Sequence, residues 1–337
     1  MGSQGSPSCI TCTGGIMNNI NQLISVTLLT AAVMAAPAVY GVENVTPLQP
    51  GATTGNAAGM LPPDGLYFSF ASSYETGFLR DENGDKAQTP GGNVKLKVNS
   101  SAASLLWVPG WEVMGARYGL SVTQPYRTIR VKTDNGISTS TDSYDGLLNT
   151  TLTPLMLSWD LGGGLFMGFG AGISLKNGKF EYQYSEAAGR NVMLGNSTAN
   201  NFYIFQPNLA FTYLRDDWAF TLNNIFNINT RNKTTEYQTG HIYYLDATAA
   251  KTMDNWTLGV IGNYTRQISN DEIKGQKVAG TPGLHTQGKR TEYAALGPLV
   301  GYNFGSFAVS GRLQFSLFAK NDVDMSILQL GVTIPLQ

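Results

Sequence analysis

The chain has 337 residues and a formal net charge of -1, and 13% of its residues are charged. A soluble domain carries about 25% charged residues, so an ordinary soluble enzyme is disfavoured, and the absence of any basic run excludes nucleic acid as a partner. The mean hydropathy of -0.10 is too low for a bundle of membrane helices. Low charge, 39 glycines and dispersed apolar residues instead indicate a transmembrane β-barrel, in which lipid-facing and lumen-facing residues alternate.

Residues 1–38 are predicted to be a leader and signal peptide. An apolar stretch at 23–38 ends in Ala36-Pro37-Ala38, a small-x-small pattern that a signal peptidase can cut. No Lys or Arg precedes Arg80, so the usual positive region is missing, and Met17 is an alternative start. A single membrane anchor is the competing interpretation of this stretch.

The two cysteines, Cys9 and Cys12, both lie in this leader. Their C-x-x-C spacing suits redox or zinc chemistry, but no second pair and no histidine stands near them. Cleavage after Ala38 would leave a mature chain without cysteine, which fits export to an oxidising bacterial envelope.

Residues 39–64 are predicted to be an irregular N-terminal segment of the mature chain. Pro47, Pro50, Pro62 and Pro63 and several glycines interrupt regular structure here. About 20 residues can reach across a barrel interior, so we hypothesise that the stretch from Val42 to Pro63 folds into the lumen as a constriction.

Residues 65–337 are predicted to form the barrel. Segments of about 10 residues alternate with a period of two, as in Leu165–Lys176, where Leu, Met, Phe and Ile on one face oppose Gly and Ser on the other. Comparable strands are predicted at Met114–Val122, Tyr203–Tyr213, Trp218–Ile228, Trp256–Tyr264, Phe307–Lys320 and Leu328–Leu336.

Short and long connections alternate between these strands. Short turns are predicted at Val108–Gly110, Asp160–Gly163, Arg215–Asp217, Thr252–Asn255 and Asn303–Ser306. Long polar loops are predicted at Gly77–Gly92, Arg127–Ser143, Asn177–Asn200, Thr230–Glu236 and Asn270–Lys289, with a tighter one at Asn321–Asp322. Outer-membrane barrels have short periplasmic turns and long extracellular loops. The pattern therefore predicts an all-β, antiparallel up-and-down barrel of twelve strands.

All five tryptophans, Trp107, Trp111, Trp159, Trp218 and Trp256, stand beside one of the short turns. Indole rings favour the membrane-water interface, so we predict that they form the periplasmic girdle. This places the chain in the bacterial outer membrane, with outer-membrane lipid and lipopolysaccharide around it. A soluble β-sandwich would also alternate, but it would bury its tryptophans in the core.

No constellation of catalytic or metal-binding residues is visible. His285 lies in a predicted loop, and His241 lies at a strand end without a specific Ser-His-Asp arrangement. The acidic run Asp81–Asp85 lacks the bidentate Glu of a calcium loop. Gly168-x-Gly170-x-Gly172 lies inside a strand, so it is not a dinucleotide fingerprint. The sequence predicts no catalytic residue, no metal and no cofactor.

The face opposite each apolar stripe is predicted to line the lumen, and it mixes polar with apolar side chains. The predicted lining residues are Tyr67, Arg117, Phe166, Lys176, Phe202, Ile204, Ile225, Tyr244, Asp246, Tyr293, Arg312 and Phe318. A water-filled porin needs a mostly polar interior, whereas apolar lining suits a conduit for hydrophobic solutes. Side chains that simply pack a narrow lumen are the alternative.

Short motifs add a resemblance to a known family. Leu61-Pro62-Pro63-Asp64-Gly65-Leu66-Tyr67 precedes the first strand, and Arg117-Tyr118-Gly119 and Pro125-Tyr126 follow in the third. In these features the chain resembles the meta-pathway phenol-degradation transporter family, outer-membrane channels of aromatic-degradation operons. The resemblance implies a monomeric barrel that passes hydrophobic, often aromatic, compounds by diffusion. The C-terminus, Ile334-Pro335-Leu336-Gln337, departs from the aromatic residue that ends many outer-membrane proteins.

We therefore predict an outer-membrane channel for passive uptake of small hydrophobic, aromatic molecules, and no enzyme. A general or weakly ion-selective water-filled porin is the main alternative. An outer-membrane enzyme or a structural barrel is a further one.

Overall fold

The structure of the chain, a computed structural model, describes Glu43 and residues 48–87, 92–186, 188–278 and 289–336. The predicted leader at 1–38, with its cysteine pair and cleavage pattern, lies outside the described residues, and so does His285. No helix in the described part is long and apolar enough to cross a membrane.

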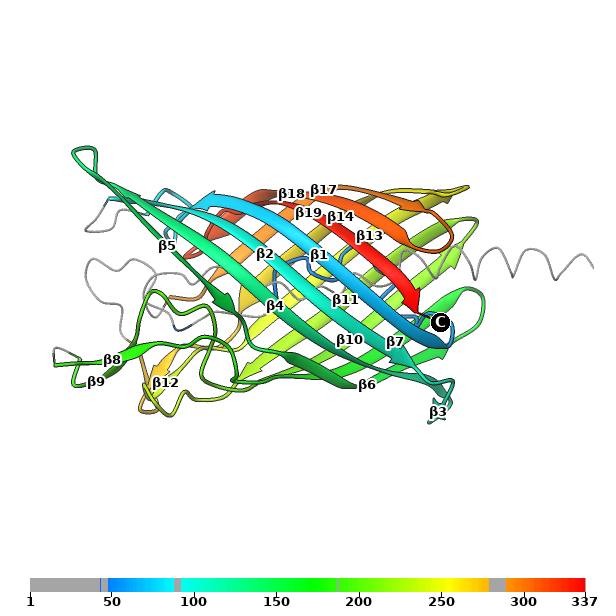
Figure 1. Ribbon diagram of the computed structural model, residues 1–337, viewed down its shortest axis with the longest axis horizontal. Helices are drawn as coiled ribbons and strands as arrows, with labels where there is room; N and C mark the ends of the chain where they lie inside the picture. The colour runs from blue at the N-terminus through cyan, green and yellow to red at the C-terminus, as the bar shows by residue number, and fades with distance from the viewer. Residues whose placement is uncertain (1–42, 44–47, 88–91, 187, 279–288, 337) are drawn as a thin grey trace, which may run out of the picture.

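Twelve antiparallel strands close into a barrel, which confirms the predicted fold class (Figure 1). Each wall strand pairs with its neighbour along the chain, and β19 closes the ring on β1, with Leu66 opposite Leu336. β5 and β6 are two parts of one wall strand, and both pair with β4. The wall strands are β1 (Gly65–Phe78), β2 (Asn93–Val108), β4 (Ala116–Asp134), β5 (Thr139–Leu147), β6 (Thr151–Asp160), β7 (Leu165–Ser174), β10 (Ile204–Arg215), β11 (Trp218–Asn229), β13 (Ile242–Met253), β14 (Trp256–Gln267), β17 (Glu292–Asn303), β18 (Ala308–Lys320) and β19 (Ser326–Leu336).

Short extra strands decorate the connections. β3 (Glu112–Val113) pairs with the start of β4, so the connection after β2 is longer than the predicted turn. In the predicted long loops, β8 (Tyr182–Ser185) pairs with β9 (Arg190–Met193). A second small sheet joins β12 (Tyr237–Gln238), β15 (Glu272–Ile273) and β16 (Gln276–Lys277).

The outward face of the wall is apolar. Along most wall strands alternate residues are exposed or half-buried, and the exposed ones include Leu222, Val260 and Phe315, each at 51%. Every wall strand except β5, which pairs with β4 alone, has a paired neighbour on both sides. A closed ladder with an apolar outside is what a bilayer demands of a β-structure, because lipid cannot satisfy backbone N–H and C=O groups. The chain is therefore a transmembrane barrel of the outer membrane.

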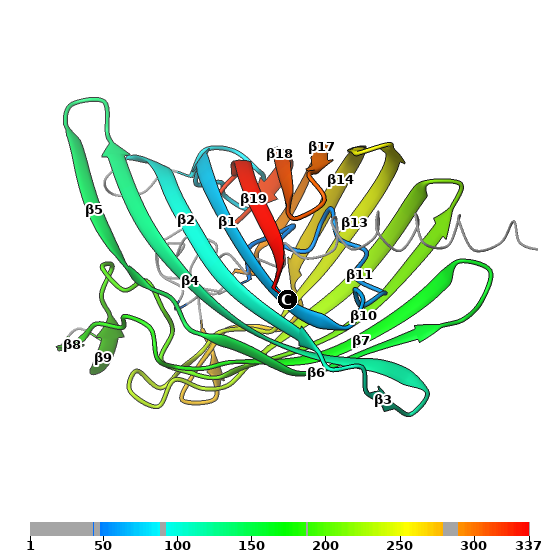
Figure 2. The ribbon, with the colours of Figure 1, turned by 45° about the vertical axis from the view of Figure 1, so that its right-hand side comes forward.

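The prediction that Arg127–Ser143 forms a loop is wrong. Most of it is strand, because β4 continues to Asp134 and β5 returns from Thr139 (Figure 2). The alternation in fact persists: Ile129 and Val131 point inward and are buried, while Arg130 and Lys132 point outward. This part of the hairpin has charged outward residues because it stands beyond the apolar band of the membrane.

The outer end of the barrel has a small apolar core of its own. Leu79 and Ala87 from the β1–β2 connection, and Val323 and Met325 from the β18–β19 connection, pack against inward residues of the wall. Arg80 forms an ion pair with Asp324, which ties the two connections together. Part of the lumen below the outer surface is thereby filled by apolar side chains.

The stretch before β1 runs down the inside of the barrel, as hypothesised, and we call its continuous described part, Leu48–Asp64, the inner segment. In Figure 2 its blue trace lies within the ring of strands. Leu48 packs with Ile225, Ile242 and Tyr244. Leu61, at the other end, packs with inward residues near the periplasmic turns.

The placement of the tryptophans gives a prediction. Because all five flank connections at the short-turn end, their native fluorescence should be quenched more by lipids brominated near the head group than by lipids brominated at the chain ends. The matched control lacks the native tryptophans and carries Leu222→Trp, about 13 Å further along β11 from Trp218. Its fluorescence should show the opposite order. Stronger quenching of the native protein by chain-end bromines would contradict the girdle.

Candidate functional site

The inner segment lies in the lumen without a strand partner. Some of its polar backbone groups bond within the segment, and others bond to side chains of the wall. Asp246 of β13 accepts from Thr53 twice, from the backbone N at 2.9 Å and from Oγ1 at 2.6 Å. From β18, Arg312 Nη1 donates to the carbonyl oxygens of Ala52, at 3.3 Å, and of Thr54. A buried acid and a buried base therefore hold one turn of the segment between them.

Gly59 holds the segment against the opposite side of the wall. Its N donates to Thr212 Oγ1 at 3.0 Å, and its carbonyl accepts from Ser158 Oγ at 3.0 Å. A Cβ on Gly59 would lie 2.7 Å from the Thr212 N, and one on Gly168 would lie 2.6 Å from the Ala58 carbonyl oxygen. The two chains approach so closely that glycine is required on both.

The periplasmic end of the segment is fixed by Arg117 of β4. Its guanidinium donates to the carbonyl oxygens of Leu61 and Pro62, at 2.9 and 2.6 Å, and forms an ion pair of 2.8 Å with Asp64. The motif residues that carried the family resemblance therefore meet one another at the mouth of the barrel.

The outer end of the chain inside the barrel is fixed at Glu43. Its carboxylate accepts from Asn232 Nδ2 at 2.8 Å and from Thr235 Oγ1 at 2.6 Å, and Arg190 lies 3.9 Å away. Burial raises the pKa of this carboxyl, although the two hydrogen bonds and Arg190 oppose the shift. Residues of two extracellular connections thus contact Glu43.

An apolar cavity of about 150 Å³ lies between the inner segment and the β2–β11 side of the wall. Apolar side chains from both partners dominate its lining: Leu48, Ala57, Met60, Leu61, Leu106, Met156 and Ile225. Gly170 and Gly172 of β7 leave room on the inward face of the wall. Polar side chains also border the cavity: Thr53, Asn56, Ser104, Ser121, Thr153, Ser158, Gln206, Asn208 and Asn223. Such a lining suits a small apolar ligand with one or two polar contacts.

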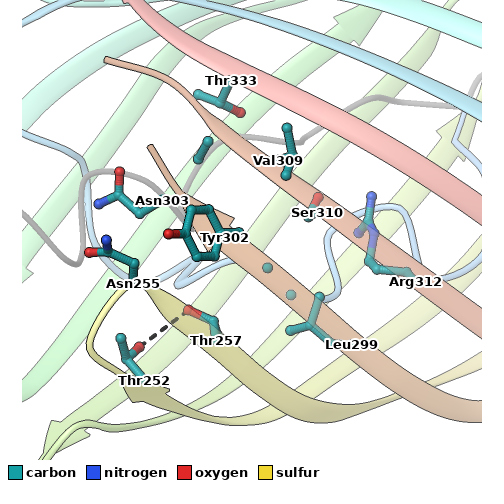
Figure 3. A pocket seen from close by; sticks show the side chains of 13 residues that line it. Thr252, Asn255, Thr257, Leu299, Tyr302, Asn303, Val309, Ser310, Arg312 and Thr333 are labelled. Carbon is teal, nitrogen blue, oxygen red and sulfur yellow. Dashed lines mark hydrogen bonds between the residues drawn. The ribbon is translucent and has the colours of Figure 1, made fainter. Parts of the chain in front are cut away.

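A polar recess lies on the other side of the segment, near the periplasmic end (Figure 3). Thr252, Thr257, Asn303 and Arg312 contribute to its lining, and it holds about 20 Å³. That is space for about one water molecule. The inner segment therefore borders two spaces of the lumen, a larger one with a mainly apolar lining and a very small one with more polar residues.

Eight of the predicted lining residues are buried within the protein at 5% exposure or less. These are Tyr67, Phe202, Ile204, Ile225, Tyr244, Asp246, Tyr293 and Arg312. Phe166 is half-buried and pairs with the buried Thr212, and Arg117 lies at the mouth. Ile225 borders the apolar cavity and Arg312 the polar recess. Their role in lining a solute path stays a prediction.

For two residues, Phe318 and Lys176, the prediction that they line the lumen is wrong. Phe318 is 40% exposed on the outside, because a bulge shifts the β17–β18 register between the pairs Ala294–Phe318 and Ala295–Ser316. Lys176 follows the end of β7 and is exposed, with its ammonium 5.4 Å from the ring of the exposed Tyr203. Both side chains therefore face away from the lumen.

Sequence reasoning missed most of the cavity lining. Leu48, Met60 and Leu61 belong to a stretch that lacks any periodicity, so no pattern marked their side chains as inward. Leu106 and Met156 were not assigned to a face. The signal that was available is the run of glycines on β7, whose missing side chains create the space.

The fold defines the class of protein: it is an outer-membrane β-barrel. A segment of the chain lies in its lumen, and an apolar cavity lies beside that segment. Residues 79–322 match the family described as "Putative MetA-pathway of phenol degradation", and the chain belongs to this family. No curated protein matches the sequence.

Solved structures with a similar fold are outer-membrane barrels. The COG4313 outer membrane channel from Pseudomonas putida F1 has a TM-score of 0.64 and 16% identity, over 82% of this chain and 97% of that one. The toluene transporter TodX of Pseudomonas putida has a TM-score of 0.41 and 11% identity, over 93% and 98%. The β-domain of the Bordetella autotransporter BrkA has a TM-score of 0.47 and 10% identity, over 81% and 100%.

The clamp on the inner segment gives a prediction. Replacing both Asp246 and Arg312 by Leu removes the bonds to Thr53, Ala52 and Thr54 without leaving one buried charge unpaired. We expect the fraction of time in a conducting state, measured on single channels in planar bilayers, to rise at least tenfold. Even one bond to a charged group contributes about 1.5–3 kcal/mol, and about 1.4 kcal/mol is a factor of ten.

The matched control replaces Glu75 and Arg127 by Leu. These are also a buried acid and base of the wall, and the side-chain hydrogen bonds of Glu75 go to Ser73 and Ser100 of β1 and β2. Its conductance should stay close to that of the parent. Equal conductance of both variants would show that the clamp does not hold the segment.

Proposed function

We propose that the protein is a channel for passive uptake of small hydrophobic molecules of about one aromatic ring across the outer membrane, and that it is not an enzyme. The apolar cavity carries this proposal. A cavity of about 150 Å³, whose lining combines aliphatic side chains with polar ones, is large enough to bind benzene. The family, described by a pathway of phenol degradation, supports an aromatic solute.

Such a cavity has to bind the solute and also has to release it toward the periplasm. Burial of apolar surface contributes about 25 cal/mol per Å², so a ring-sized solute gains a few kcal/mol in the cavity. This offsets the cost of leaving the hydrophobic outer leaflet. Passage to the periplasm then requires the inner segment to shift, because Leu61, Met60 and Ala57 of the segment form part of the cavity lining.

A water-filled porin fits the lumen less well. The polar recess holds about one water molecule, and the segment occupies the space between it and the apolar cavity. For catalysis, His241 is already engaged, because its Nδ1 accepts from the backbone N of Asn229 at 3.2 Å. Among the described residues no cluster of His, Cys, Asp and Glu could hold a metal ion.

Filling the apolar cavity should block uptake. A Cβ on Gly172 would meet its nearest neighbour at 3.4 Å, so Gly172→Phe can place a ring in the cavity without displacing the backbone. We expect uptake of radiolabelled toluene by cells or vesicles to fall about tenfold, because the added ring occupies the space of the solute.

The matched control is Gly311→Phe, which adds the same side chain on the lipid-facing side, where the nearest neighbour of a Cβ also lies at 3.4 Å. Its uptake should equal that of the parent. Unchanged uptake by folded Gly172→Phe protein would exclude the cavity from the path. Rapid sugar entry in liposome swelling, with no toluene uptake, would favour the porin.

Tethering the inner segment should also stop uptake. Thr53 Oγ1 of the segment lies 3.1 Å from Asn223 Nδ2 of the wall, so a disulfide between Thr53→Cys and Asn223→Cys would fix the segment. We expect oxidised protein to lose uptake and a reductant to restore it.

The control disulfide joins Ser104→Cys to Thr123→Cys. Their hydroxyls lie 2.7 Å apart on the neighbouring wall strands β2 and β4, so this bond links wall to wall and leaves the segment free. Uptake through this variant should not respond to oxidation. Full uptake through the oxidised Thr53–Asn223 variant would show that the segment does not need to move.

A further inference from the structure

Five cations gather on the outward face of the barrel at its outer end, over β2, β4 and the β1–β2 connection. Lys97, Arg130 and Lys132 are exposed, and Lys95 is half-buried. Lys86 and Lys95 both lie over the ring of Phe78, with their ammonium nitrogens 4.2 and 5.1 Å from its centroid. We call these five residues the cationic patch. It lies outside the lumen, on the surface that faces the membrane and the medium.

The strand register sets cations directly opposite cations. Lys97 pairs with Arg130, and Lys95 pairs with Lys132, in consecutive outward positions of β2 and β4. Like charges directly opposite one another destabilise a sheet. Carboxylates nearby are few: Asp134 lies 3.9 Å from Lys132 at the upper edge, and Asp145 accepts from the Tyr126 hydroxyl. Such an arrangement is stabilised when an anion binds across it.

The opposite wall of the barrel shows the ordinary arrangement. There Glu292 of β17 pairs with Arg266 of β14 on one side and with Lys320 of β18 on the other. Charges of alternating sign stabilise neighbouring strands. Arg266 lies ten residues from Trp256, and Lys97 lies ten residues from Trp107, so the two clusters stand at the same height.

That height matches the outer surface of the membrane. Ten residues at about 3.3 Å each and a strand tilt of about 40° rise about 25 Å, which is the height of the apolar band of such barrels. Exposed Tyr74 and Tyr126 lie just below the patch on β1 and β4. The Lys97–Arg130 pair therefore stands at the level of the outer head groups, and the Lys95–Lys132 pair stands one step above.

We propose that the cationic patch binds the phosphate groups of a lipopolysaccharide molecule in the outer leaflet, whose acyl chains lie along the apolar outside of β2 and β4. Lys and Arg are the side chains that bind phosphates by charge-assisted hydrogen bonds. A glycolipid with more than one phosphate matches two stacked cation pairs. The inference rests on the outer-membrane location and is independent of the solute path.

Native mass spectrometry of the purified full chain in detergent, titrated with bis-phosphorylated lipid A, tests the proposal. Lys97→Gln with Arg130→Gln should weaken binding about tenfold. Arg266→Gln with Lys320→Gln removes the same charge at the same height, and it should change binding by less than about twofold. Lys97→Arg with Arg130→Lys should retain binding. Heat-modifiable migration on gels confirms that each variant is folded. If the Lys97→Gln, Arg130→Gln variant fails to fold, Lys95→Gln with Lys132→Gln replaces it and should weaken binding in the same way.

Three results would overturn the proposal. Equal loss in both Gln pairs would show that net charge, not the patch, attracts the lipid. Binding of phosphatidylethanolamine as tight as that of lipid A would show that the acyl chains suffice. Displacement of lipid A by millimolar inorganic phosphate would show a simple phosphate site.

Discussion

The structure depends on one constraint: a stretch of chain without a strand partner has to be accommodated inside a closed barrel. Every buried N–H and C=O of such a stretch needs a partner. The wall supplies many of them from side chains, with Asp246 and Arg312 on one side, Thr212 and Ser158 on the other, and Arg117 at the mouth. Several inward polar side chains of the wall therefore bond to the inner segment.

This explains why a lumen of mixed composition need not be a water-filled pore. The polar residues of β13 and β18 engage the inner segment and leave a recess for about one water molecule. On the β7 side, where glycines replace side chains, the segment cannot fill the space, and an apolar cavity remains.

The barrel could be predicted from the sequence because alternation, turn length and tryptophan position all follow from the membrane. Outside the membrane these signals weaken, so the sequence predicts a loop where β4 and β5 extend, although Ile129 and Val131 continue the alternation. Phe318 was misplaced because Phe315, Leu317 and Phe318 are apolar in both phases, so no pattern can reveal the bulge between them. The course of the inner segment was hypothesised from its length, but its contacts depend on residues up to 260 positions away, which no local pattern encodes.

The covalent continuity of the inner segment with β1 has a consequence for how such a channel is regulated. At Gly65, φ is 151°, and the next residue is already paired on both sides in the wall. A segment that leaves its bonds therefore stays attached at the periplasmic rim, and its local concentration in the lumen remains high. In the proposed mechanism, reclosure would be a unimolecular event, because the gate is part of the same chain as the barrel.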